Sequence, residues 1–333
     1  MIKRLLLLAA CCTLWFMFGA APASADGGPH RAGGPVADGC AGCHRAHTAK
    51  AGKLLKEAQP ALCFTCHGTS ATGGKTDVVS GLGYTASLPR SGPGALRGGG
   101  FTSALIGSNA PTGQVTDSFN ATGIVPVKAA GVTTTSTHSV DGTAGTAWGN
   151  GVLGSATAGK NVSLSCGSCH DPHGNGNYRI LKPLPRDSGA TVGIAIADYT
   201  PPAPVPPATV SAAPKVYTTA NYWKVDDDQA PGFIANVSAW CTTCHTRYLA
   251  TTDTSVDSGD PVFTFRHKSD SKSQGGASCI QCHVAHGSNA LMNPALSHAK
   301  SALATDPGSI VVTGSSKLLR IDNRGTCQMC HNK

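Results

Sequence analysis

The sequence predicts a mostly irregular fold, with short helices at a recurring Cys-x-x-Cys-His motif, a few small strands, and a core that side chains alone do not fill. Charged residues make up 13% of the chain, against roughly 25% in a typical globular protein. Aromatic residues make up 5%, whereas glycine (41 of 333 residues) and proline (21) are abundant. The chain therefore has few large apolar side chains from which to build a core.

The motif occurs six times and includes every cysteine after Cys12. Residue frequencies alone predict about 0.02 copies in a chain of this length. The six copies are Cys40/Cys43/His44, Cys63/Cys66/His67, Cys166/Cys169/His170, Cys241/Cys244/His245, Cys279/Cys282/His283 and Cys327/Cys330/His331.

Covalent attachment of haem c explains the histidine that follows each second cysteine. Two thiols bind the porphyrin vinyl groups, and the adjacent imidazole binds the iron. Zinc sites and disulfide frameworks are the alternatives, but neither needs a histidine at this position. The sequence therefore predicts six covalently bound haem c groups, whose large apolar porphyrins would organise the core.

Seven further histidines are candidates for the sixth ligand of each iron. They are His30, His47, His138, His173, His267, His286 and His298. Methionine is scarce, because Met1 and Met17 lie in the N-terminal segment, Met329 lies inside a motif, and only Met292 is left over. We therefore expect low-spin irons with two histidine ligands and low reduction potentials.

The motifs form three repeated units of two. The first, third and fifth motifs continue to Cys-x-x-Cys-His-x-x-His and each has a histidine upstream (His30, His138 and His267), whereas the second, fourth and sixth lack the extra histidine after the motif. If the motif is a helical turn, histidines three residues apart share one face and cannot bind one iron from opposite sides. We expect the second histidine (His47, His173 or His286) to bind the second haem of its own unit, and the upstream histidine to bind the first. Either His298 or His30 is then left over, as a spare or as a ligand between subunits.

The expected organisation begins with a secretory signal at 1–25, with a basic start, an apolar stretch and the cleavage sequence Ala23-Ser24-Ala25. A lipoprotein cleavage box at Leu8–Cys11 is the alternative. The two-haem units are expected at 26–75, 136–250 and 251–333, with a Gly/Thr/Ser-rich connector at 76–135 and a proline-rich insert at 198–214. No later segment approaches the roughly 20 apolar residues that span a bilayer, so we do not expect a membrane-spanning protein.

The stretch 30–67, with its His-x-x-His and "ALCFTCH", resembles the doubled motif of paired-haem multihaem cytochromes, and "CGSCHDPHG" and "CIQCHVAHG" resemble it too. The second unit departs from this pattern, because residues 171–240 separate its two motifs. The resemblance implies an exported electron carrier like those of metal-respiring bacteria, some of which polymerise into extracellular haem filaments.

Two functions agree with these observations. The first is conduction of electrons along a chain of haems, in extracellular electron transfer at the cell surface or outside the cell. Its partners would be redox proteins or extracellular acceptors, or further copies of the chain in a head-to-tail homopolymer. The alternative is a multihaem reductase of nitrite or hydroxylamine, which would need an open iron position. Enough histidines exist to occupy every such position, so we do not expect an enzyme. The net charge of +8 would be balanced by the negatively charged propionates of the haems. We therefore expect no nucleic-acid partner.

Overall fold

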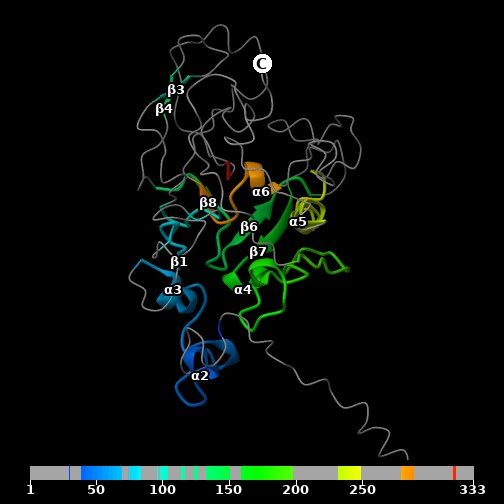
Figure 1. Ribbon diagram of the computed structural model, residues 1–333. Coiled ribbons are helices and arrows are strands. Elements are labelled where there is room, and N and C mark those ends of the chain that lie inside the picture. The colour runs from blue at the N-terminus through cyan, green and yellow to red at the C-terminus, as the bar shows by residue number, and fades with distance from the viewer. Residues whose placement is uncertain are drawn as a thin grey trace, which may run out of the picture.

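The computed structural model describes residues 30, 39–69, 74, 76–83, 96, 98–103, 114–116, 124–126, 133–150, 159–197, 232–248, 279–288 and 318–319. The expected signal segment 1–25, the insert 198–214, His267, His298 and the sixth motif (Cys327, Cys330, His331) lie outside these residues. Figure 1 shows α2 at one end of the described part, α3 and α4 above it, and α5 and α6 further along.

The first motif of each unit forms a helix of one turn. These helices are α2 (Cys40–Cys43), α4 (Cys166–Cys169) and α6 (Cys279–Cys282). The histidine after α2 and the histidine after α4 are both extended, with φ/ψ of −106°/146° and −108°/146°. Each pairs with a leucine in an antiparallel bridge, His44 with Leu55 and His170 with Leu181. The helix therefore ends before the histidine.

The second motif of a unit belongs to a longer helix. Helix α3 (Ala61–His67) contains the whole second motif, and α5 (Phe233–Cys241) ends at the first cysteine of the fourth. These two helices bury apolar side chains that the one-turn helices lack, namely Leu62, Phe233 and Val237. Packing of this apolar face stabilises helices that are too short to persist alone.

A tight turn follows the first motif of the first unit and of the second. It contains the 3₁₀ helices η1 (Gly52–Leu54) and η2 (Tyr178–Ile180). Left-handed backbone with φ between 52° and 60° occurs at Lys53, Leu54, Arg179 and Ile180, and also at Leu318, which with Leu319 is the described part of 316–320. Left-handed backbone is unusual for such residues. We define the segments 52–56 and 178–182 as the basic–leucine turns.

The strands form four antiparallel pairs in the described part of the chain. The pairs are β1 (Thr76–Asp77) with β2 (Leu82–Gly83), β3 (Gln114–Thr116) with β4 (Ile124–Pro126), β5 (Ser136–Thr137) with β8 (Gly287–Ser288), and β6 (Ala144–Ala147) with β7 (Lys160–Ser163). The pair of β5 and β8 joins the second unit to the third. It places His138 next to His286, whose carbonyl accepts a hydrogen bond from the His138 backbone N–H at 3.0 Å.

A small apolar core lies between η2, α5 and α6. It contains Tyr178, Ile196, Phe233 and Val237, and Trp240 packs against it. The Tyr178 and Phe233 rings meet edge to face, with centroids 5.0 Å apart. Few large side chains are buried in the described ranges, and coil connects short helices and two- to four-residue strands. The expected irregular architecture is thus confirmed there, while its organisation by haem stays a prediction. Within the same ranges no helix has the length and apolar character needed to cross a bilayer.

Candidate haem-binding sites

Three motif histidines donate a hydrogen bond from Nδ1 to a backbone carbonyl. His44 donates to Lys53 at 2.9 Å, His170 to Arg179 at 2.9 Å, and His245 to Trp148 at 2.6 Å. Because a carbonyl only accepts, the proton must lie on Nδ1 in each case. Nε2 is therefore unprotonated and available, which is the tautomer that binds a metal, and the carbonyl makes the ring a more basic ligand.

Burial keeps three of the motif histidines neutral. Burial lowers the pKa of His170 and of His245 below its ordinary value, and the carbonyl hydrogen bond only partly opposes this effect. Burial also lowers the pKa of His67, and the neighbouring His30 lowers it further. Metal binding requires neutral imidazole, so these rings are ready for it at neutral pH.

Each of these histidines faces a second imidazole. The ring pairs are His44 with His173 (centroids 6.3 Å apart, planes at 11°), His67 with His30 (6.0 Å, 71°), His170 with His286 (6.4 Å, 61°) and His245 with His138 (6.1 Å, 43°). An imidazole nitrogen lies about 2 Å from a bound metal, so two rings on opposite sides of one iron have centroids roughly 6 Å apart. The four pairs therefore fit the two axial positions of four haem irons.

The pairing differs from the one expected from the sequence. His173 lies beside His44 of the first unit, and not beside His245 of its own unit. In the same way His286 lies beside His170 of the preceding unit. The expectation assumed that the motif histidine continues the helix, but the backbone of that histidine is extended and the helix stops before it. The second histidine is therefore directed back to the first haem motif of the preceding unit.

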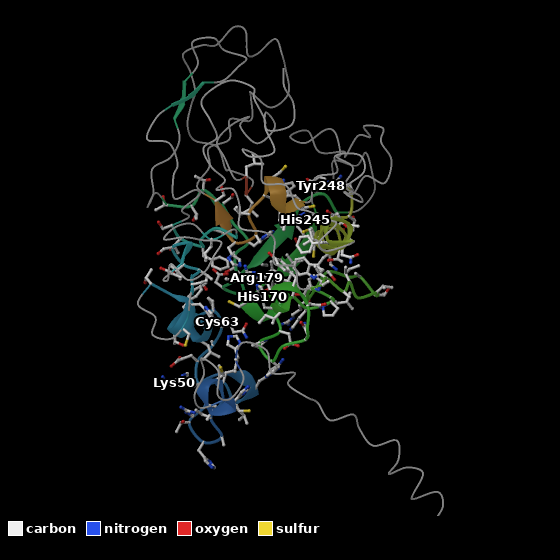
Figure 2. All side chains as sticks on the ribbon, in the orientation of Figure 1. Lys50, Cys63, His170, Arg179, His245 and Tyr248 are labelled. Atoms are coloured by element: carbon white, nitrogen blue, oxygen red, sulfur yellow. The ribbon has the colours of Figure 1, made fainter. Side chains whose placement is uncertain are left out.

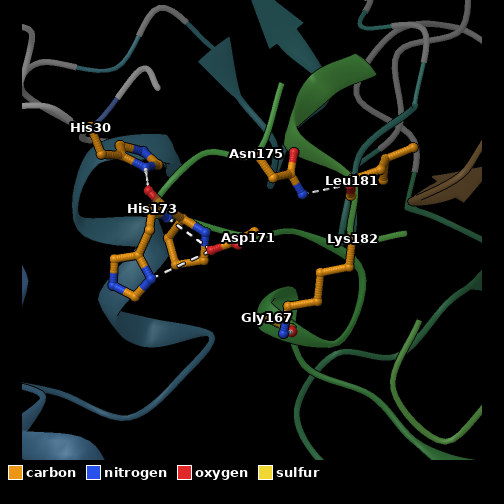
Figure 3. A network of polar contacts seen from close by, with 8 residues as sticks. His30, Gly167, Asp171, His173, Asn175, Leu181 and Lys182 are labelled. Atoms are coloured by element: carbon orange, nitrogen blue, oxygen red, sulfur yellow. Dashed lines mark hydrogen bonds and ion pairs between the residues drawn. The ribbon is translucent and has the colours of Figure 1, made fainter. Parts of the chain in front are cut away.

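The upstream histidines also differ from expectation. His30 lies beside His67 and not beside His44, and His138 lies beside His245 and not beside His170. His30 and His138 each lie beside the histidine of the second motif in their own unit. Each donates from Nδ1 to a carbonyl in the first motif loop of the next unit: His30 to Pro172 at 2.9 Å and His138 to Ala285 at 2.6 Å. Figure 3 shows His30 above the loop that carries His173.

We call the three residues that end at the second histidine the reaching loops; they are 45–47, 171–173 and 284–286. The loop at 171–173 provides both a ring against His44 and a carbonyl for His30. The loop at 284–286 does the same for His170 and His138. His47, expected at the second motif of the first unit, lies instead on an exposed bend, away from the His67 ring. Among the residues that the structure describes, none pairs with it.

Thiol contacts join successive motifs. A hydrogen bond from the Cys63 thiol to Cys166 raises the pKa of Cys63, and one from Cys241 to Cys279 raises the pKa of Cys241. These bonds connect the second motif to the third and the fourth motif to the fifth. Figure 2 shows Cys63, His170 and His245 following one another along the molecule.

The two motifs within a unit are also close. Burial is the main cause of the raised pKa of Cys43, and the thiols of Cys63 and Cys66 raise it further. Burial raises the pKa of Cys169 to about 11, and the Cys244 thiol adds to this effect. The five described motifs therefore follow one another in space in their sequence order.

Two structural features were missed from the sequence. The first is the basic–leucine turn, whose carbonyl holds the motif histidine; "GKLLK", "YRILK" and "SKLLR" repeat the pattern basic–aliphatic–Leu–basic in all three units and could have revealed it. The second is the segment 148–150 after β6. Besides Trp148, Gly149 accepts from the Arg247 backbone N–H at 2.7 Å, and Asn150 donates to the Cys244 carbonyl at 2.7 Å. Only a lone tryptophan in a Gly-rich stretch signals this second feature.

The zinc and disulfide alternatives receive no support from the described residues. No group of three or more His, Cys, Asp or Glu side chains gathers there as a metal site would require. No disulfide joins the ten cysteines of the first five motifs.

Residues 34–72 match a family model described as the doubled CXXCH motif. This match supports a multihaem c-type cytochrome. The matched stretch contains the whole of the first two motifs, and it indicates covalently bound haem c and a role in electron transfer. No curated protein and no solved structure matches the chain.

The angles between paired rings predict distinguishable spectra for the oxidised holoprotein. Nearly parallel imidazoles split the iron d orbitals strongly and give a rhombic low-spin signal, whereas steeply crossed imidazoles give a highly anisotropic one. Electron paramagnetic resonance should therefore show a rhombic component from the His44–His173 pair (11°) and anisotropic components from the pairs at 61° and 71°. The His173→Met variant should lose the rhombic component. Retention of every component in this variant would contradict the pairing.

A second prediction concerns Asp171, whose Oδ1 lies 3.4 Å from Nδ1 of His173. A carboxylate partner makes an imidazole a stronger electron donor than a carbonyl does, and stabilises ferric iron. Asp171→Asn should raise the midpoint potential of one haem by a few tens of millivolts, where about 59 mV is a tenfold change for one electron. Glu57→Gln is the matched control, because it removes the same charge beside the exposed Lys50. Spectroelectrochemical titration measures both variants. Equal shifts in the two would show that the charge acts without the ring contact.

Proposed function

We propose that the protein is a hexahaem c-type cytochrome that conducts electrons along a linear series of haems, each with two histidine ligands. When bound, each haem supplies an iron that alternates between ferric and ferrous states, so that the oxidation of one site reduces its neighbour. The observation that carries the proposal is the set of four imidazole pairs, each of which links a motif to a histidine that fits the opposite axial position.

Contacts between successive motifs support a path in sequence order. The sulfur atoms of Cys63 and Cys166 lie close together, as do those of Cys241 and Cys279, so neighbouring units meet at their attachment cysteines. The reaching loops 171–173 and 284–286 also each contact both haem sites of the preceding unit. Electron transfer between haems needs neighbouring sites that lie close together. Haem sites that worked independently would not need such contacts.

The reductase alternative needs an iron with an exchangeable position and acid–base groups beside it. A spare imidazole stands 6.0–6.4 Å from the motif histidine at four of the motifs, where it would occupy that position. This arrangement favours conduction over catalysis, and we propose no enzymatic activity. The predicted signal at 1–25 favours export, with redox proteins or extracellular acceptors as partners at the cell surface or outside the cell.

The reaching loops also support a head-to-tail polymer. The loop of the second unit completes the first unit, and the loop of the third unit completes the second. The loop of the first unit, 45–47, contacts no other unit in the described residues, and its His47 is exposed. If the same contact formed between two copies of the chain, His47 would bind the haem of His283 in the second copy. The Ala46 carbonyl would then accept a hydrogen bond from His267 of that copy.

The adjacent surface supports the same contact. Leu54, in the basic–leucine turn of the first unit, is 55% exposed, whereas its counterpart Ile180 in the second unit is partly buried. A contact between different surfaces of identical chains propagates into a filament unless its rotation closes a ring. We therefore propose that the subunits polymerise, with His47 as the ligand between them.

The haem count is tested by the intact mass of the exported protein. We expect the mass of the chain from Asp26 plus six haem groups, because each of the six motifs provides two attachment cysteines and a histidine. Replacing both Cys327 and Cys330 by Ala should remove one haem mass and leave five. A wild-type mass with fewer haems would overturn the count, and a different N-terminus would overturn the cleavage site.

The polymer is tested by electron microscopy of the native secreted protein. The wild type should form filaments, and His47→Ala should abolish them while the covalent haem count stays at six. Thr48→Ala is the control, because it alters the exposed neighbour and no ligand. A wild type that stays monomeric with six low-spin irons would contradict the polymer. Filaments of unchanged structure in His47→Ala would contradict the role of His47.

A further inference from the structure

The distal imidazole of the third haem site is held differently from the others. His286 has a largely buried ring, and burial lowers its pKa to about 4. Its Nδ1 atom is buried and faces the Gly99 backbone outside hydrogen-bond geometry. In contrast, Nδ1 of His30 and of His138 each donates to a backbone carbonyl. Another interaction must therefore set the orientation of the His286 ring.

That interaction comes from the connector between the first two units. The Phe101 ring stacks on the His286 ring, with centroids 4.8 Å apart and planes at 25°. The Phe101 backbone is held on both sides, because its N–H donates to Val78 at 3.0 Å and its carbonyl accepts from the Thr134 hydroxyl at 3.0 Å. The phenyl ring is thus a fixed surface against which the imidazole lies.

The glycines before Phe101 allow this approach. The Gly98 carbonyl accepts a hydrogen bond from the His286 backbone N–H at 2.6 Å. A Cβ atom at Gly98 would lie 2.9 Å from Nδ1 of His286, and one at Gly99 would collide with the Gly287 carbonyl. Gly99 also has a φ of +69°, which glycine adopts without strain. Backbone and imidazole meet here only because side chains are absent.

We infer that Gly98–Phe101 is a positioning segment that sets the plane of the His286 imidazole and thereby tunes the third haem, attached at Cys166 and Cys169. The inference rests on the proposed function, in which His286 is an axial ligand. Phe101 touches neither attachment cysteine. It acts through the histidine, as an outer contact that orients an axial ligand.

The segment also connects two neighbouring sites. Phe64, which lies between the two cysteines of the second motif, has its ring 6.1 Å from that of Phe101. Phe64, Phe101 and His286 therefore form a continuous aromatic series from the second motif to the distal ligand of the third. A change at Phe101 should affect the third haem first, because only His286 among the ligands stacks on it in the described structure.

The test compares Phe101→Leu with Phe101→Tyr in the full-length holoprotein. Leucine keeps an apolar side chain but removes the flat ring, so His286 can rotate and donate from Nδ1 to the Gly99 carbonyl. The ring becomes a stronger donor, and the potential of one haem should fall. At fixed potential, its ratio of reduced to oxidised form should fall roughly threefold, which corresponds to about 30 mV. Tyrosine keeps the ring and should leave the titration unchanged.

Electron paramagnetic resonance provides the second readout. Phe101→Leu should alter the anisotropic signal assigned to the pair at 61° and leave the rhombic signal of the His44–His173 pair. Gly98→Ala should alter the same signal by direct contact with His286. Gly145→Ala is its matched control, because a Cβ there meets no atom within 4 Å. If Phe101→Leu loses haem on folding, Gly98→Ala and Phe101→Tyr still decide the question.

The outcomes separate the two proposals. His286→Met should change one haem in both measurements if the proposed ligand role is correct. If it does so while Phe101→Leu and Gly98→Ala leave every signal unchanged, the positioning role is wrong and the ligand role stands. If His286→Met changes no haem, then His286 is not a ligand, and both the pairing and the inference fail.

Discussion

An iron with two axial histidines requires imidazoles on opposite faces, and a single Cys-x-x-Cys-His motif provides only one of them. The second must come from elsewhere in the chain. In the proposed arrangement it would come from the reaching loop of the following unit or from an upstream histidine held by that loop. Each unit would then be completed by the next, and the order of the units in space would follow from ligand supply. Few large side chains are buried in the described part. In such a chain, contacts between units that share ligands can take the place of an extended apolar core.

The supply of a histidine ligand from one unit to another explains the local structure of the first motif in each unit. The one-turn helix ends before its histidine, whose extended backbone carries the following loop away from the helix axis. The basic–leucine turn then brings a carbonyl back to Nδ1 of the same histidine. This turn places non-glycine residues in left-handed backbone, which has a conformational cost of order 1 kcal/mol or more per residue. Recurrence of that strained turn in the first two units agrees with a role in holding the ligand.

The groups that contact the candidate ligand histidines differ from site to site. Backbone carbonyls accept hydrogen bonds from five of the described histidines, Asp171 contacts His173, and the glycines with Phe101 enclose His286. Hydrogen bonding, charge and ring orientation all alter how strongly an imidazole donates to iron. Haems of identical chemistry in one chain would then differ in potential, and a conductor tolerates such differences as long as neighbouring sites are close.

The sequence alone determined the chemistry: the number of attachment motifs, the supply of spare histidines and the threefold repeat all follow from residue identity and spacing. It also predicted short helices in a largely irregular chain, because so few apolar residues are present. The partner of each histidine was decided only by the tertiary structure. His44 and His173, or His170 and His286, are far apart in sequence, and the helical spacing that suggested another pairing did not apply because the helix stops at Cys43 and at Cys169. Likewise, no pattern in the Gly-rich connector predicts its contact with His286. Pairing depends on where the chain turns back on itself, and that is settled by contacts between distant segments rather than by local sequence.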